Sequence, residues 1–251
     1  MTSEAGTVQP GRSAELPSGV PTQLLIGGKW TDGSAGAFEV LNPSTGAVLT
    51  TVSRPGLDDL DQALAAAHAA GPGWAGTAPR ERAEVLRRTF DLMIERREQL
   101  ATVMSLEMGK TLTDARGEVT YAAEFFRWFS EEAVRIDGDL RWAPSGANRI
   151  LTFRRPVGVA LLLTPWNFPA AMATRKLAPA LAAGCTVVLK PPGETPLSAL
   201  LVAQLLTEAG APEGVVNVLA TDQPGDLVAA ALADDRVRKI CLLYTSPSPR
   251  D

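Results

Sequence analysis

The sequence predicts an α/β protein built on a doubly wound parallel sheet. Three short and almost continuously apolar runs, at residues 159–164, 186–190 and 215–219, alternate with helical patterns at about 170–183 and 196–209. Apolar strands that alternate with helices in this way are typical of parallel strands buried on both faces. In such a sheet the ligand site lies at the carboxyl ends of the strands.

A strand lead-in precedes this alternation. Residues 1–22 are rich in Ser, Gly and Pro and lack the apolar core of a secretion signal, so we expect a disordered tail there. Extended pieces follow at 23–26 and 38–41, and turn residues such as Asn42-Pro43 separate them from what comes next. We therefore expect an antiparallel arrangement at the start of the ordered chain.

Three helices and a hairpin are expected between this lead-in and the parallel strands. The helices run from about 58 to 70, from 79 to 106 and from 111 to 136, and the first stops at Gly71-Pro72-Gly73. Residues 148–155 alternate as a strand, with the loop of a hairpin before them. The third helix carries four aromatic residues at helical spacing, which is typical of core packing: Tyr121, Phe125, Trp128 and Phe129.

The composition excludes several classes of function. Apolar residues make up 45% of the chain and charged residues 21%, with a formal net charge of −4. No long basic run favours nucleic acid or an anionic membrane as a partner, and the longest apolar stretch, 157–163, is too short to cross a bilayer. Two cysteines do not make a disulfide framework, which favours a cytoplasmic protein, and we find no cluster of metal ligands.

The first parallel strand ends in a rigid turn, Thr164-Pro165-Trp166-Asn167-Phe168-Pro169. Because proline fixes φ, the two prolines hold Asn167 in one direction. A side-chain amide held at a strand end can donate to a developing oxyanion. Asn167 can equally serve as a cap for the helix that begins near Pro169.

The second strand ends in Lys190-Pro191-Pro192-Gly193. A lysine that leaves a buried strand onto a Pro/Gly turn lies where the ribose or phosphate of a nucleotide would bind. The alternative is a surface lysine with a buried stem and a solvated ammonium. Neither turn contains the G-x-G-x-x-G fingerprint, so no ordinary dinucleotide site can be assigned by motif.

Seven stretches, in order between about residues 26 and 240, resemble the aldehyde dehydrogenase superfamily. They are Glu107–Lys110, Pro156–Val159, Thr164–Pro169, Lys176–Cys185, Lys190-Pro191, Glu194–Pro196 and Gly210–Val218. This family binds a nicotinamide cofactor in a Rossmann-like domain without the glycine fingerprint. The resemblance therefore implies NAD or NADP as cofactor and an aldehyde as substrate.

The resemblance also assigns roles to the two turns. It implies that Asn167 supports the oxyanion of the thiohemiacetal and that Trp166 lines the nicotinamide side, beside Thr164 and Pro165. Lys190 would contact the adenosine ribose or a 2′-phosphate, on the turn formed with Pro191 and Pro192. Many NAD-preferring members carry a glutamate where this chain has Gly193. Without that carboxylate a 2′-phosphate is not repelled, which favours NADP⁺ but leaves the choice open.

Two further stretches, 125–133 and 170–176, resemble succinate-semialdehyde dehydrogenases. This resemblance implies oxidation of succinate semialdehyde to succinate by a homo-oligomer, with Arg175 binding the carboxylate of the substrate. Glutarate semialdehyde or another aldehyde acid remains open. Arg175 is alternatively a charge on the surface of a helix.

The resemblance divides the chain into an amino-terminal part of the cofactor domain at 23–137, an oligomerisation-type hairpin at 138–156 and an NAD(P)-binding part at 157–240. The family continues towards a glutamate base and a catalytic cysteine, whereas residues 241–251 can be encoded by a transposase adapter used in sequencing libraries.

We therefore expect an inactive fragment without the catalytic domain, in which neither Cys185, expected to be a packing residue, nor Cys241 is the nucleophile. The alternatives are a complete, non-catalytic nucleotide-binding module and a subunit that associates with a full-length dehydrogenase.

Overall fold

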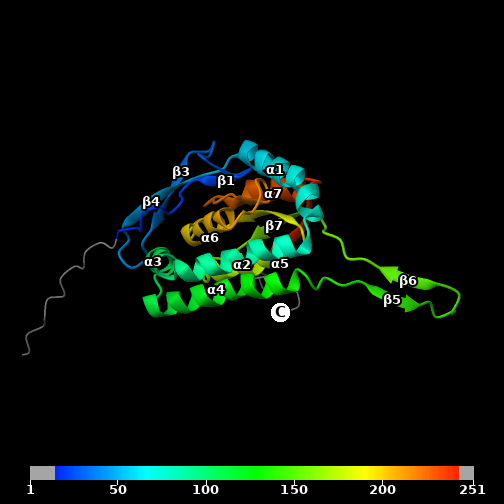
Figure 1. The fold of residues 1–251 in the computed structure, drawn as a ribbon. Coiled ribbons are helices and arrows are strands. Elements are labelled where there is room, and N and C mark those ends of the chain that lie inside the picture. Colours follow the sequence, from blue (N-terminus) through cyan, green and yellow to red (C-terminus); the bar gives the residue numbers. More distant parts are fainter. Residues whose placement is uncertain (1–14, 243–251) are drawn as a thin grey trace, which may run out of the picture.

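The computed structural model describes residues 15–242, and its main sheet has six strands in the order β10-β7-β8-β9-β1-β2 (Figure 1). The parallel strands are β7 (Val159–Leu163), β8 (Thr186–Lys190), β9 (Val216–Val218) and β10 (Val237–Leu242). Antiparallel to them, β1 (Leu24–Ile26) pairs with β9, and β2 (Lys29–Thr31) pairs with β1. The predicted parallel sheet is confirmed, and part of the strand lead-in extends it.

Helices cover both faces of this sheet. In β7, Val159 and Leu161 pack with α1 (Leu57–Gly76) and α7 (Pro224–Ala233). The alternate residues Ala160 and Leu162 pack on the other face, which α5 (Pro169–Ala182) and α6 (Leu197–Glu208) cover. Because successive side chains of a strand point to opposite faces, these apolar runs bury both sides of the sheet. The sheet is therefore doubly wound, as predicted.

An outer layer of helices packs on α5 and α6 (Figure 1). It consists of α2 (Pro79–Glu95), α3 (Arg97–Met108) and α4 (Leu112–Glu132). The single helix predicted over 79–106 is wrong, because the backbone leaves helical geometry at Arg96, with φ −96° and ψ 24°. Apolar residues continue on both sides of this break, with Met93 before it and Leu100 after it, both fully buried, so the pattern does not reveal it.

Helix α1 passes through Pro72 and ends at Gly76, beyond the stop predicted near residue 70. A proline inside a helix costs about 3 kcal/mol. The last turn is nevertheless anchored by Trp74, which is 2% exposed and donates its indole N–H to the carbonyl oxygen of Leu181 at 3.1 Å. Tertiary packing therefore overrides the local stop signal.

The aromatic residues of α4 are only partly in the core. Phe125 and Phe129 are half-buried against it, but Tyr121 and Trp128 are exposed, so the core prediction is wrong for these two. The side of α4 that is buried presents mostly small residues, together with the fully buried Phe126. The large rings therefore lie at the edge of the helix contact.

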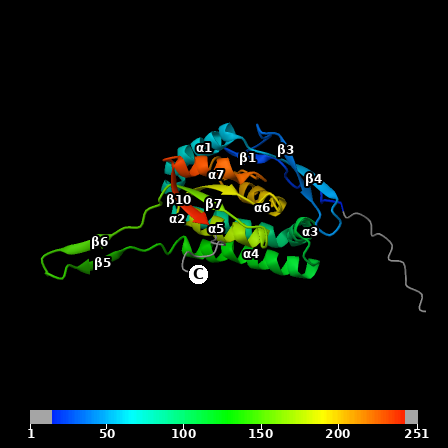
Figure 2. The ribbon, with the colours of Figure 1, turned by 180° about the vertical axis from the view of Figure 1, so that it is seen from behind.

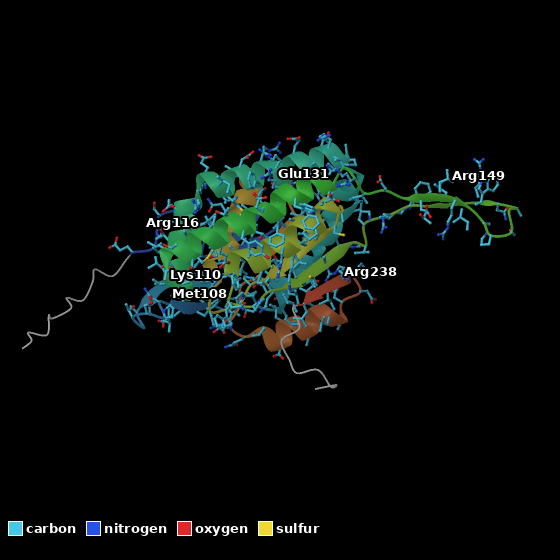
Figure 3. All side chains as sticks on the ribbon, turned by 90° about the horizontal axis from the view of Figure 1, so that it is seen from below. Met108, Lys110, Arg116, Glu131, Arg149 and Arg238 are labelled. Atoms are coloured by element: carbon cyan, nitrogen blue, oxygen red, sulfur yellow. The ribbon has the colours of Figure 1, made fainter. Side chains whose placement is uncertain are left out.

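The predicted hairpin is confirmed as β5 (Asp139–Trp142) paired antiparallel with β6 (Arg149–Thr152). It projects away from the body of the protein (Figure 2), and Figure 3 shows Arg149 far out on this arm. A separate two-stranded sheet pairs β3 (Ala37–Leu41) with β4 (Val48–Ser53).

The predicted ends of the ordered chain need correction. Leu16 and Val20 pack against the core, because apolar side chains gain by burial, so the disordered tail expected over 1–22 is wrong for 15–22. Residues 1–14 lie outside the described part. Cys241 and Leu242 belong to β10, whereas 243–251 lie outside the described part. No helix between residues 15 and 242 is long and apolar enough to cross a membrane.

Candidate functional site

The two turns singled out in the sequence begin side by side. Strands β7 and β8 pair in parallel with Leu163 opposite Lys190, so both turns leave the same edge of the sheet. The buried Thr195 of the second turn donates its hydroxyl to the carbonyl oxygen of Trp166 in the first, at 3.3 Å. A direct hydrogen bond therefore joins the two turns.

This edge is also the topological switch point of the sheet. The chain adds β8 and β9 on one side of β7, then crosses through α7 and returns to place β10 on the other side of β7. A crevice forms where the strand order reverses in this way. A pocket of about 380 Å³ lies there, lined by Leu163, Thr164, Pro165, Lys190, Pro224, Gly225, Val228 and Leu242.

The pocket combines apolar walls with unused hydrogen-bond donors. Helix α7 starts at Pro224, and its N-cap residue Gln223 provides no side-chain cap. Within residues 15–242 the N–H groups of Gly225 and Asp226 therefore have no capping side chain from Gln223, and this turn carries the positive end of the helix dipole together with the carboxylate of Asp226. Thr164 is buried, and its Oγ1 finds no hydrogen-bond partner among residues 15–242. Orphaned donors at a helix N-terminus favour an anionic group such as a phosphate.

Lys190 also lines a second hollow of about 690 Å³, together with Pro192, Gly193 and residues of β3. Burial lowers the pKa of Lys190, and the nearby Glu194 acts in the opposite direction. A Cβ atom at Gly193 would lie 2.7 Å from the Cα of Asp222. Glycine is therefore required for this close approach of the turn to the loop after β9.

Asp222 is itself held by Arg54, whose Nε and Nη2 donate to its two carboxylate oxygens at 2.7 and 2.9 Å. The hydrogen bonds from Arg54 hold the pKa of Asp222 below its ordinary value. The carboxylate of Asp222 is thus matched by a bidentate guanidinium, whereas Glu194, which lines the same hollow, acts on Lys190.

The other predicted residues lie around these two hollows rather than in them. Trp166 and Asn167 are exposed on the first turn, and Pro191 is buried. Arg175 lies on α5, where its Nη2 donates to the Tyr121 hydroxyl at 2.9 Å and its guanidinium carbon lies 5.2 Å from the centroid of the Phe125 ring. Arg175 is thus held by aromatic neighbours and lines neither hollow.

Sequence reasoning missed several residues of this edge. Pro224, Gly225 and Val228 come from α7, a helix expected after the third strand but without bounds, and Leu242 comes from β10, for which no strand was predicted. It also missed the buried Lys176, whose Nζ donates to the carbonyl oxygens of Leu163 and, at 3.0 Å, Cys241. This ammonium bridges the carboxyl ends of β7 and β10. A lysine in the mostly apolar α5, directly after Arg175, was the available signal.

Comparison with known proteins agrees with this fold. The Aldehyde dehydrogenase family profile matches residues 30–243. A succinate-semialdehyde dehydrogenase of Paenarthrobacter nicotinovorans is 53% identical over 200 residues, which is 80% of this chain and 44% of the relative. An NADP⁺-dependent one from Escherichia coli is 46% identical over 219 residues (87% and 45%), and a glutarate-semialdehyde dehydrogenase of Pseudomonas aeruginosa is 45% identical over 219 residues (87% and 45%).

The solved structures give the same answer. The crystal structure of succinate-semialdehyde dehydrogenase from Burkholderia pseudomallei superimposes with a TM-score of 0.87 at 43% identity, over 91% of this chain and 48% of that one. The chain thus spans slightly less than half the length of these relatives. A profile match over most of the sequence, together with this superposition, shows that the chain belongs to the aldehyde dehydrogenase family.

Proposed function

We propose that the chain supplies the NAD(P)-binding part of an enzyme that oxidises succinate semialdehyde to succinate. The pocket at the switch point carries the proposal, because it joins the two strand-end turns to the uncapped start of α7. Relatives named succinate-semialdehyde dehydrogenase support the reaction. Because the chain spans less than half of those relatives, the activity is proposed for the whole protein.

The residues of the pocket fit a nicotinamide dinucleotide. The free N–H groups of α7 and the orphaned Thr164 hydroxyl would bind the diphosphate, and Val228 and Leu242 would pack against a flat ring. Lys190 would hold the ribose or a 2′-phosphate. When bound, the nicotinamide supplies the hydride acceptor of the oxidation.

We propose that NADP⁺ is accepted at least as well as NAD⁺. Gly193 itself carries no carboxylate, and the nearby Asp222 is paired with Arg54. Glu194 is the remaining carboxylate in this hollow, and Lys190 lies close enough to offset its charge. Two relatives, from Escherichia coli and Schizosaccharomyces pombe, carry NADP⁺ in their names.

Arg175 and Asn167 would act on the two ends of the aldehyde acid. The guanidinium of Arg175, held by Tyr121 and Phe125, offers fixed donors to a carboxylate. The side-chain amide of Asn167 would donate to the aldehyde oxygen as negative charge develops on it. Glutarate semialdehyde is the second candidate, because relatives of that name are 45% identical.

We propose that neither cysteine is the attacking thiol. Cys185 is buried just before β8, at the opposite end of that strand from Lys190. Cys241 lies within β10 and packs against the core. The role of this chain would then be to bind the cofactor and to orient the aldehyde.

The hairpin favours a second proposal, that the chain associates with another copy or with a longer dehydrogenase. Its side chains Leu140, Trp142, Leu151 and Phe153 are all more than half exposed. An isolated two-stranded hairpin is only marginally stable in water, so a partner strand would stabilise it. Light scattering of the chain and of a Trp142→Ser/Phe153→Ser variant tests this proposal, which predicts a smaller assembly for the variant.

The function itself is tested by comparing binding with turnover. We expect this chain to bind NADP⁺ without oxidising succinate semialdehyde, and the product of the gene read onward past Ile240 to do both. Turnover by this chain that disappears in a Cys241→Ala variant would overturn the assignment of the cysteines. No oxidation of any aldehyde by the longer product would overturn the proposed reaction.

A further inference from the structure

Two buried carboxylates replace the missing caps of α5 and α6. The N-cap residues of these helices are Phe168 and Pro196, and neither side chain makes a cap hydrogen bond. Instead, Glu118 of α4 accepts from the backbone N–H groups of Ala170 and Ala171, each at 3.1 Å. Glu107 of α3 accepts in the same way at the start of α6, from Leu197 at 2.7 Å and Ser198 at 2.8 Å.

These contacts lie directly behind the two turns of the candidate site. The turn with Asn167 runs into α5, and the turn with Lys190 runs into α6. Each turn therefore has one end fixed by a strand of the sheet and the other by a carboxylate of the outer layer. Glu107 is 2% exposed and Glu118 4% exposed, so both accept these hydrogen bonds away from water, where hydrogen bonds are strong.

Lys110 adds a direct contact to the first turn. Its Nζ pairs with Glu118, lies 3.5 Å from the carbonyl oxygen of Asn167 and sits 4.5 Å from the centroid of the Phe168 ring. The lysine reaches this position because Gly109, with φ 82°, ends α3 in the left-handed region and turns the chain. Figure 3 shows Met108 and Lys110 close together at this end of the helical layer.

Glu107 differs from Glu118 in having no cationic partner. Within residues 15–242, no lysine, arginine or histidine nitrogen lies within ion-pair distance of its carboxylate. It lines the second hollow beside Lys190 and Gly193. The two turns thus have separate supports, one an ion pair and the other a lone carboxylate.

We propose that Lys110 and Glu118 are positioning residues for the Asn167 turn, and that Glu107 is the positioning residue for the Lys190 turn. The consequence for catalysis rests on the proposed function, but the consequence for geometry does not. Loss of the ion pair should disturb the turn that carries Trp166 and Asn167. Loss of the Glu107 carboxylate should weaken nucleotide binding at Lys190.

The test separates the two turns with two readouts on the full chain. Labelling with 5-fluorotryptophan gives a ¹⁹F signal for Trp166, assigned with Trp166→Phe, and a calorimetric titration with NADP⁺ gives its affinity. We expect Lys110→Met and Glu118→Gln to shift or broaden the Trp166 signal, while the signal of the buried Trp74 stays unchanged. We expect Glu107→Gln to leave the Trp166 signal unchanged and to weaken NADP⁺ binding about fivefold or more, because a difference of about 1 kcal/mol corresponds to that factor.

Lys110→Arg is the matched control, because it keeps the charge and should keep the Trp166 signal of the unaltered chain. Should Glu118→Gln fail to fold, Lys110→Met carries the test, since it leaves the cap of α5 in place. Equal effects of Lys110→Met and Glu107→Gln on both readouts would mean general destabilisation and would overturn the proposal. An unaltered chain that binds no NADP⁺ would overturn the proposed function, and the Trp166 signal would still decide the role of Lys110 and Glu118.

Discussion

The ion pair between Lys110 and Glu118 gives the sharpest thermodynamic prediction. Its two side chains are 11% and 1% exposed, and Glu118 also accepts two backbone N–H groups of α5. Glu118→Ala leaves a largely buried ammonium and two buried N–H groups without their partner, a change that costs about 3–5 kcal/mol. Lys110→Met costs less, about 2 kcal/mol, because the remaining carboxylate keeps its two N–H donors.

The double variant should be more stable than the two single losses together imply. It removes both charges, so the main remaining costs are the lost cap, about 1 kcal/mol, and a small cavity. The two single losses add to about 5–7 kcal/mol and the double loss should cost about 2–3 kcal/mol, so we expect a coupling energy of about 3 kcal/mol between Lys110 and Glu118. The exposed pair of Glu124 and Arg127, on the same helix, is the control and should couple by no more than about 0.5 kcal/mol.

Urea unfolding followed by circular dichroism and by tryptophan fluorescence measures these energies, provided that the two probes give the same transition. The unfolding free energy of a domain is typically about 5–15 kcal/mol, so a loss of about 4 kcal/mol should visibly move the midpoint. A coupling energy for the buried pair no larger than that of the exposed pair would refute the argument.

Three further predictions concern single residues. Burial raises the pKa of Glu107 from its ordinary value of 4.5 to about 7, despite the N–H donors that act against this shift. Between these two pH values the folded state binds a proton that the unfolded state has lost, so this contribution to stability is complete below pH 4.5 and is lost as the pH rises to about 7. The urea midpoint should therefore fall with rising pH over this range, and Glu107→Gln should remove that dependence. An unchanged dependence of the midpoint on pH in Glu107→Gln would contradict the prediction. Gly193→Ala should destabilise the chain by about 1–3 kcal/mol and weaken NADP⁺ binding, because the added Cβ would clash with the backbone of Asp222. A thermal midpoint and an NADP⁺ affinity equal to those of the unaltered chain would show that the turn can move, contrary to this prediction. Trp74→Phe should lower the free energy of unfolding by about 1 kcal/mol, because it removes the hydrogen bond to Leu181. It should also speed amide hydrogen exchange in the turn of α1 that follows Pro72. An unchanged exchange rate would show that this bond does not anchor the turn.

The parallel part of the fold was predictable because its signals are local. The run Thr186–Lys190 has three apolar residues in succession between a threonine and a lysine, and the structure forms a strand over the same residues. The breaks in the helical layer were not predictable in this way. Arg96 interrupts a helix although apolar residues continue past it, and Pro72 does not interrupt one because Trp74 is anchored by Leu181, 107 residues away in the sequence.

Part of the candidate site was likewise predictable from local patterns, and part of it was not. The neighbourhood of Thr164 and Lys190 follows from the rule that parallel strands end at one edge. The contribution of α7 and β10 depends on the chain crossing the sheet after β9, a choice that no local pattern encodes. Likewise, Lys110 precedes Asn167 by 57 residues, and only the packing of the outer helices brings them together.

The central claim is that the turns after β7 and β8 form one binding site for a nicotinamide dinucleotide. A calorimetric titration of NADP⁺ into the unaltered chain, Lys190→Met and Lys29→Met tests it most directly, because Lys29 is an exposed lysine on β2 and its loss changes the net charge equally. A hydrogen bond to a charged group contributes about 1.5–3 kcal/mol, so Lys190→Met should weaken binding about tenfold or more while Lys29→Met leaves it unchanged. Equal affinities for all three proteins would contradict the claim.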